Sequence, residues 1–242
     1  MRLFLFFLLL PIVVFSKSNI ELTATKALEW QMKSKSVVAI GSAKVVYNKM
    51  IITAERITGY YSDDGKNKNF YKLVAKGNVN IKNSSSKIET QKLEYNLTSE
   101  ILILTGNPWT RLIHESALLS SKLPITFNNK TKEAKVKNAE IKHENRILTA
   151  PILTAYFSQS NSFEKAVTTG KTTLKTEEET LTSDSAEYDS KKGIATLKNN
   201  VFLKRTDGTT LKGGKLVYDM NKGFSRLYAD NSSGKVIGIF EK

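Results

Sequence analysis

Residues 87–96 read KIETQKLEYN, and this stretch contains the pattern that decides the fold. Counted from Ile88, positions 0, +2, +5 and +7 hold Ile, Thr, Leu and Tyr. The same spacing recurs in TLTSDSAEYD at 180–189 and in TLKGGKLVYD at 210–219. Short runs rich in β-branched and aromatic residues, bounded by polar turn residues, are typical of strands. The pattern therefore predicts β-structure.

Weaker copies of this pattern extend along the chain. They begin at residues 52, 118 and 148, and a partial copy begins at Thr23. Together with the three clear copies, the starting points lie 29 to 36 residues apart. Self-similarity at such a period is the signature of repeat architectures. We interpret residues 19–242 as about seven repeats of roughly 30 residues, with an alternative division into two halves at about 19–145 and 146–242.

A second kind of strand lies between the copies and alternates through a central glycine or asparagine. Clear examples span residues 37–45, 73–81, 166–174 and 195–203, with Asn199 at the centre of the last. A degraded example spans 102–110, and the one expected near Asn138 is barely visible. Each repeat therefore supplies two strands.

The spacing of the repeated positions also predicts how the strands bend. Side chains alternate between faces with period two, so the odd step from +2 to +5 needs a bulge or sharp bend if all four positions face inward. In the partner strand, a central Gly or Asn removes side-chain bulk at the same level. We expect an all-β, elongated fold of stacked, bent antiparallel strands, V-shaped in cross-section.

The first 18 residues have the form of an export signal. Arg2 precedes the apolar stretch Leu3–Phe15, which is shorter than the roughly 20 residues of a membrane-spanning helix. Small residues around Ser16 and Ser18 suit a signal peptidase. We expect cleavage and a periplasmic location, with association with the inner or outer membrane left open. An uncleaved anchor is the main alternative, and a buried N-terminal strand is a further one.

Composition argues against most enzyme chemistry. The 242 residues include no cysteine and two histidines, so thiolate catalysis and three-histidine metal sites are excluded. No convincing carboxylate pair, Ser-His-Asp set or phosphate-binding glycine loop is present, and we expect neither an enzyme nor a cofactor. The formal charge of +14 is spread among acidic residues rather than concentrated in a stripe with aromatic residues. Nucleic-acid binding is therefore not expected.

The sequence also resembles a known family. Residues 77–109, GNVNIKNSSSKIETQKLEYNLTSEILILTGNPW, resemble the repeat of OstA-like proteins, the LptA family of periplasmic lipopolysaccharide-transport proteins. Residues 51–65, IITAERITGYYSDDG, resemble that family's A-[DE]-R strand, and Thr23–Trp30 resembles its opening strand. The likeness covers most of residues 20–229. The stretch GNPWTRLIHESA at 106–117 departs from the family pattern, and the chain is longer than a usual single-bridge subunit.

This resemblance implies a β-jelly-roll whose interior shields lipid acyl chains. It implies that the partners are lipopolysaccharide, through its lipid A portion, and transport components of the inner and outer membranes that share the fold. These would join by edge-strand pairing, with head-to-tail self-association as a further option. The candidate edges are the strand at Ala24–Trp30, the last strands at Leu216–Ala229, and Lys235–Phe240. For the apolar segment Val236–Phe240, the alternative is that it folds back over its own edge.

Inward-phase positions are then the candidate lipid-groove residues. They are Val79, Ile81, Ile88, Leu93, Tyr95, Val201, Leu203, Leu211, Leu216 and Tyr218. The alternative for each is plain packing in a closed core. For the whole chain, the preferred function is a non-catalytic lipid-transfer scaffold. An inner-membrane-anchored relative, an exported structural or adhesive β-repeat protein, and a repeat-fold carbohydrate enzyme remain as competitors.

Overall fold

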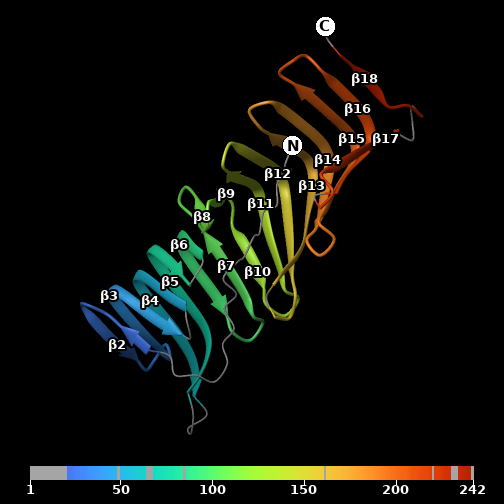
Figure 1. Cartoon of the computed structure of the whole chain (residues 1–242). Coiled ribbons are helices and arrows are strands. Elements are labelled where there is room, and N and C mark those ends of the chain that lie inside the picture. The colour runs from blue at the N-terminus through green and yellow to red at the C-terminus, as the bar shows by residue number, and fades with distance from the viewer. Residues whose placement is uncertain are drawn as a thin grey trace. The chain divides into compact units, whose positions relative to one another are not determined.

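The structure, a computed structural model, describes residues 21–47, 50–63, 68–83, 86–160, 162–219, 221–229 and 234–240. These residues form 18 strands, and every strand pair with a defined register is antiparallel (Figure 1). None of the described residues forms a helix that is long and apolar enough to cross a membrane. The expected signal segment, residues 1–18, lies outside the described residues.

The chain divides into two compact units. The N-terminal unit includes described residues 21–115 and 120–134, and the C-terminal unit includes 116–119 and the described residues from 135 onward. Strands of the N-terminal unit are β1 (Glu21–Thr23), β2 (Ala27–Gln31), β3 (Ser36–Tyr47), β4 (Met50–Asp63), β5 (Lys68–Lys82), β6 (Ser86–Asn96), β7 (Ile101–Thr105), β8 (Thr110–His114) and β10 (Ile125–Asn128).

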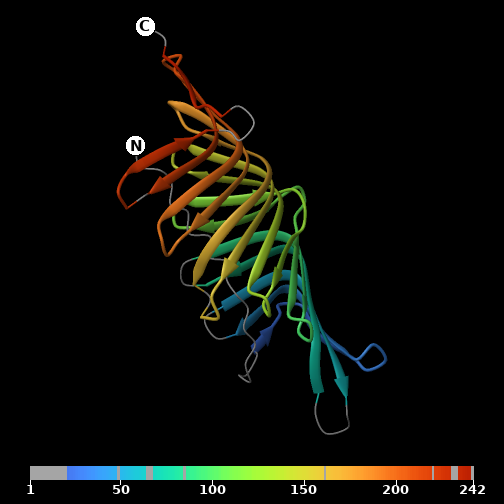
Figure 2. The ribbon, with the colours of Figure 1, turned by 90° about the vertical axis from the view of Figure 1, so that its right-hand side faces the viewer.

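Strands of the C-terminal unit are β12 (Arg146–Phe157), β13 (Phe163–Lys175), β14 (Glu179–Asp189), β15 (Ile194–Arg205), β16 (Thr210–Asp219), β17 (Phe224–Tyr228) and β18 (Ile237–Ile239). Two further strands, β9 (Ala117–Ser121) and β11 (Glu133–His143), contain the points at which the division falls. The barely visible copy near Asn138 is thus a full strand. Within each unit, the longer strands are curved (Figure 2).

Many of the hairpins end with the same turn chemistry. The side chain of Asn96 accepts hydrogen bonds from the backbone N–H groups of Thr98 and Ser99, at 3.0 and 2.9 Å. Asn128, Asp189 and Asp219 accept similar bonds from residues two or three positions later. Four residues after each of these side chains, the backbone takes a positive φ, at Glu100, Lys132, Gly193 and Gly223. This Asx-turn device closes hairpins of one length and so keeps the repeat in register.

The predicted mid-strand irregularity is present, but its extra residue lies in the other strand type. Gly41 and Ser42 of β3 lie opposite the single residue Glu55 of β4. Both have positive φ, 79° and 40°. The same shift occurs at Gly77, Gly170 and Asn199, whose φ values are 79°, 85° and 61°. Glycine and asparagine are needed here because they readily adopt the left-handed backbone conformation that the bulge requires. The predicted reason, removal of side-chain bulk at the bend, is less important than this backbone requirement.

The predicted inward facing of the repeated positions is present in β6, where Ile88, Thr90, Leu93 and Tyr95 are all buried, and also in the weaker copy of β4. In β4, Ile52, Ala54 and Ile57 are buried, whereas the consecutive residues Glu55 and Arg56 are exposed. Odd-numbered residues of β4 therefore point outward before the position opposite the bulge and inward after it. The aligned bulges crease the sheet of each unit along one line.

Two weak copies do not follow the predicted facing. In the copy that begins at Leu118, Ser120 and Ile125 are buried as predicted, but Leu123 is exposed and Leu118 is only partly buried, while Ala117 and Leu119 on the opposite phase are buried. The reason is that residues 122–124 interrupt the strand and separate β9 from β10. In the first copy, Leu28 and Trp30 are exposed because β2 lies at an edge of its unit, paired on one side with β3.

Candidate lipid-binding interior

The inward face of the N-terminal unit consists of apolar rows that run across neighbouring strands. One row joins Ile52, Ile81, Ile88 and Leu112 of β4, β5, β6 and β8 in direct cross-strand register. A second row, on the other side of the bulges, joins Ile57, Ala75, Leu93, Leu104 and Ile125. All of these residues are buried. Cross-strand apolar pairs of this kind stabilise a sheet and make one face continuously apolar.

The predicted groove residues lie in these interiors, five in each unit. Val79, Ile81, Ile88, Leu93 and Tyr95 are all at most 3% exposed. In the C-terminal unit, Val201, Leu203, Leu216 and Tyr218 form one buried cluster with Leu181 and Leu197, and the partly buried Leu211 packs against it. The structure thus brings each set of five together within its own unit. Contact of either set with lipid stays a prediction.

An apolar pocket opens beside β2 in the N-terminal unit, and sequence reasoning did not select the residues that line it. Its volume is about 280 Å³. The lining is almost wholly apolar, with Lys72 the charged residue, and includes Leu22, Val37, Val45, Ile57, Gly59 and Leu73. Most of these stand at inward positions of the repeat pattern. The repeat pattern does not reveal which inward positions lie near an open end of the unit. The groove residues predicted from it in this unit lie deeper, at most 3% exposed.

Aromatic residues surround the mouth of this pocket. Trp30 donates a hydrogen bond from Nε1 to the hydroxyl of Tyr61 at 2.9 Å, and the two ring centroids are 5.7 Å apart. Phe70 packs edge-on against Tyr61 at 5.8 Å. The Lys68 ammonium lies 4.2 Å from the centre of the Trp30 ring. Trp30 and Phe70 are 53% and 41% exposed, so the mouth presents apolar rings to solvent.

Gly59 keeps the pocket open because it has no side chain. A Cβ atom at this position would lie 2.9 Å from the ring of Phe70. Any side chain here would therefore push the Phe70 ring or fill the space between β4 and β5. The pocket consequently depends on a glycine at the +7 position, where clear copies of the repeat have tyrosine.

One polar pair in the N-terminal unit is a contact that sequence reasoning missed. Ser86 Oγ lies 2.9 Å from Nδ1 of His114, and Oε1 of Glu115 lies 3.9 Å from Nε2. Ser86 and His114 come from neighbouring strands β6 and β8 and are both buried. Their hydrogen bond satisfies two polar groups inside an apolar interior. Among the described residues, no group of three or more His, Asp or Glu side chains could hold a metal ion.

The chain is similar to proteins of a known family. The sequence profile of the family described as "LptA/(LptD N-terminal domain) LPS transport protein" matches twice, at residues 21–133 and 124–224. No curated protein matches the chain significantly. Among solved structures, the chain is similar to LptH, the LptA-homologous periplasmic component of the lipopolysaccharide transport device of Pseudomonas aeruginosa. The two are 12% identical, the match covers 60% of this chain and 97% of that one, and the TM-score is 0.41.

The two profile matches together span residues 21–224, well over half of the chain. The two profile matches confirm the family resemblance inferred from the sequence. The strands of the structure confirm the all-β class and the stacked antiparallel arrangement. The chain belongs to the LptA/(LptD N-terminal domain) family of lipopolysaccharide transport proteins.

Proposed function

We propose that this protein is a periplasmic, non-catalytic scaffold that shields the acyl chains of lipopolysaccharide in its apolar interior. The observation that carries the proposal is the apolar pocket beside β2, which opens toward solvent and shares Ile57 with the second apolar row of the N-terminal unit. A lipid chain that entered at this mouth would meet apolar side chains along the crease of the unit.

The physical basis is the cost of exposing acyl chains to water. Each buried CH₂ group is worth about 0.8 kcal/mol, so a lipid with several chains does not cross an aqueous compartment unprotected. A continuous apolar interior removes this cost over the whole route. Because no single position binds more tightly than the next, the lipid can still move along it. Scaffolding of this kind requires no reacting group.

We further propose that edge strands join this protein to transport components of the same fold, or to further copies of itself. In the N-terminal unit, the free edge is β2, where Leu28 and Trp30 are exposed. In the C-terminal unit, β17 and β18 pair with the two halves of β16 and leave Phe224, Tyr228 and Ile239 exposed. Unpaired strand edges with apolar side chains are templates for pairing with another chain.

Two details refine the candidate edges named from sequence: one corrects an assignment, and the other selects between its two alternatives. Residues 216–219 are not at an edge, because β16 is paired on both sides, with β15 and with β17 and β18. The apolar C-terminal segment folds back onto its own sheet, since Ile237–Ile239 pairs with Thr210–Lys212. The edge available to a partner in the C-terminal unit is therefore formed by β17 and β18 together.

Photo-crosslinking at three positions tests both parts of the proposal. A photoreactive side chain replaces Leu73, which lines the pocket, Leu28 on the edge strand, or Thr53, which points away from the interior between Ile52 and Ala54. The protein is exported through its own N-terminal segment, and adducts are identified by mass. We expect a glycolipid adduct at Leu73, a protein adduct at Leu28 and neither at Thr53.

The results at the three positions test the lipid-shielding proposal and the edge-pairing proposal separately. Folded, exported protein without an adduct at Leu73, or with equal lipid adducts at Leu73 and Thr53, contradicts the lipid-shielding proposal. Absence of a protein adduct at Leu28 contradicts edge pairing and leaves the lipid result intact. The mass of the exported protein also measures whether residues 1–18 are removed.

A further inference from the structure

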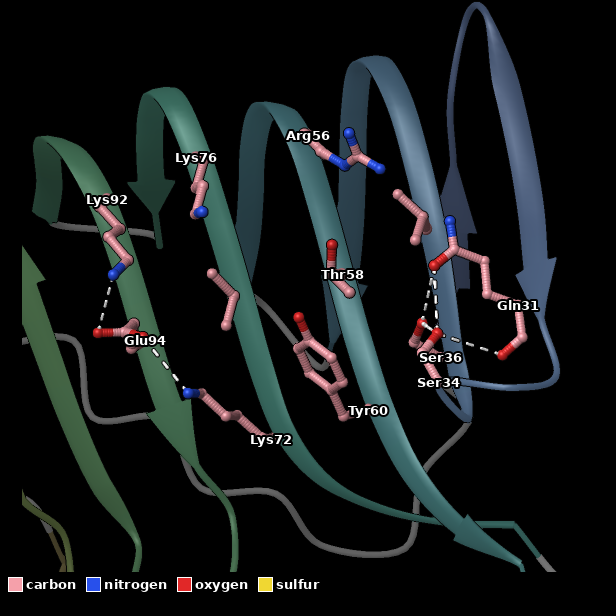
Figure 3. A pocket seen from close by; sticks show the side chains of 12 residues that line it. Gln31, Ser34, Ser36, Arg56, Thr58, Tyr60, Lys72, Lys76, Lys92 and Glu94 are labelled. Carbon is pink, nitrogen blue, oxygen red and sulfur yellow. Dashed lines mark hydrogen bonds and ion pairs between the residues drawn. The ribbon is translucent and has the colours of Figure 1, made fainter.

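The outward face of the N-terminal unit carries a second hollow, separate from the apolar pocket. It has a volume of about 430 Å³ and lies over β2 to β6 (Figure 3). Four cationic side chains line it, Arg56, Lys72, Lys76 and Lys92, together with the carboxylate of Glu94. On β4, Arg56, Thr58 and Tyr60 face this hollow, whereas the alternating residues Ile57 and Gly59 line the apolar pocket. Apart from Lys72, which reaches both, the two sites therefore use opposite faces of the same strands.

Three of the cations stand in one row across the sheet. Arg56 of β4 is directly opposite Lys76 of β5, and Lys76 is directly opposite Lys92 of β6. Figure 3 shows these side chains side by side on three successive strands. Strands in a sheet are separated by about 4.8 Å, so the row spans about 10 Å. Like charges placed directly opposite one another destabilise a sheet, and the row is therefore costly unless an anion meets it.

The single carboxylate in the hollow does not neutralise the row. Glu94 lies 3.1 Å from the Lys92 ammonium and 3.4 Å from that of Lys72. Hydrogen bonding from Lys92, more than any other contact, holds the pKa of Glu94 below its usual range. Among the described residues, neither Arg56 nor Lys76 lies within 4.0 Å of a carboxylate oxygen of Asp or Glu. The lining residues carry a net formal charge of three positive.

The C-terminal unit shows that the fold itself does not require this row. At the same level beside its bulges, the cross-strand partners are Thr169, Ser185, Lys198 and Lys215. Only two of these are cationic, and Lys198 pairs with Glu187 at 3.2 Å. A strand therefore accommodates its bulge with neutral neighbours. Among the described strand pairs from β13 to β16, no such three-cation row occurs, so the row is a feature of the N-terminal unit.

We propose that the outward hollow binds a ligand with closely spaced phosphate groups. The planar guanidinium of Arg56 can bond a phosphate through two N–H groups, and the lysine ammonium groups add compact charge. Thr58 and Tyr60 supply hydroxyl groups on the same side of the sheet (Figure 3). A recessed site with several donors suits a phosphorylated headgroup or solute better than a flat acidic protein surface. Binding here does not depend on acyl chains entering the opposite face.

Calorimetric titration of the full chain with inorganic pyrophosphate tests this site. The site variant is Arg56→Ala/Lys76→Ala, and the matched control is Lys198→Ala/Lys215→Ala, which removes the same charge from the same level of the C-terminal unit. We expect the site variant to bind pyrophosphate about tenfold or more weakly, since charge-assisted hydrogen bonds are lost. We expect the control to bind like the unaltered protein.

Sedimentation with vesicles identifies the source of the phosphate. Vesicles of phosphatidylcholine with phosphatidylglycerol are compared with vesicles of phosphatidylcholine alone. If the protein binds pyrophosphate and the anionic vesicles through Arg56 and Lys76, the site recognises lipid headgroups. If it binds pyrophosphate but not the vesicles, the site recognises a soluble phosphorylated ligand. Both results support the hollow as a phosphate site.

Three results would overturn the proposal. The first is that the unaltered protein binds neither pyrophosphate nor the anionic vesicles. The second is that the site and control variants lose equal affinity for pyrophosphate. The third is that polyglutamate binds at Arg56 and Lys76 more tightly than pyrophosphate does. Circular dichroism checks that each variant is folded. The single variant Lys76→Gln, which keeps the length of most of the side chain, repeats the test if the double variant does not fold.

Discussion

Truncation of Leu93 to alanine distinguishes a closely packed interior from one that leaves room beside its side chains. Leu93 is 1% exposed and lies directly opposite Ala75 on one side and Leu104 on the other. Burial of this degree places Leu93 among ordinary core leucines. Leu→Ala changes in such cores cost about 2 to 5 kcal/mol, from lost transfer free energy and from the cavity left behind. We expect a loss of about 3 kcal/mol.

Urea denaturation followed by tryptophan fluorescence measures this loss in the right part of the chain. Both tryptophans, Trp30 and Trp109, lie in the N-terminal unit, so the signal reports that unit. With a slope of about 1.5 kcal/mol per molar urea, the expected loss lowers the midpoint by about 2 M. The control Glu94→Gln alters the partly exposed, outward ion pairs with Lys72 and Lys92 and should cost less than about 1 kcal/mol.

A loss below about 1 kcal/mol for Leu93→Ala would refute this reasoning, because it falls under the range for packed core leucines. It would mean that the leucine side chain borders loosely filled space in the lipid-free protein. The path of the lipid would then pass beside Leu93, next to the strand bulges. A loss near the expected value would instead place the lipid-accessible region nearer the pocket mouth.

Two further predictions concern the bulge and pH. Gly77→Ala should lower the free energy of unfolding by about 2 kcal/mol or more, because φ is +79° and a Cβ atom would overlap the Glu55 side chain. Gly223→Ala, with φ +62° and nothing within 4 Å, should cost only about 1 kcal/mol, and thermal melts compare the two. The pKa of Glu187 is lowered from 4.5, chiefly by hydrogen bonding from Lys165. The ionised Glu187 therefore stabilises the folded protein above pH 4.5, and this stabilisation is lost as the pH falls through the folded-state pKa. Glu187→Gln should therefore narrow the difference between melting temperatures at neutral and acidic pH, and an unchanged difference would contradict the ion pair's role.

Local pattern was sufficient to predict most of the fold. The 0, +2, +5, +7 spacing depends only on the period of a strand and on one interruption, and both are properties of short segments. Leu93 and Tyr95 were thereby assigned to the interior correctly. The copy at 118–125 failed because three residues, 122–124, break the strand, and nothing in its apolar spacing reveals that break.

The amino-acid sequence by itself determined the all-β class, the repeat, the inward phase of the clear strands and the family. These follow from side-chain alternation and turn chemistry, which act over a few residues. Only the tertiary structure decided which inward residues border open space and which outward cations meet. The pocket at Gly59 and the row of Arg56, Lys76 and Lys92 both depend on cross-strand register between residues that are 14 to 22 positions apart. Register of this kind is fixed when bulges and turns align whole strands, and no single segment contains that information.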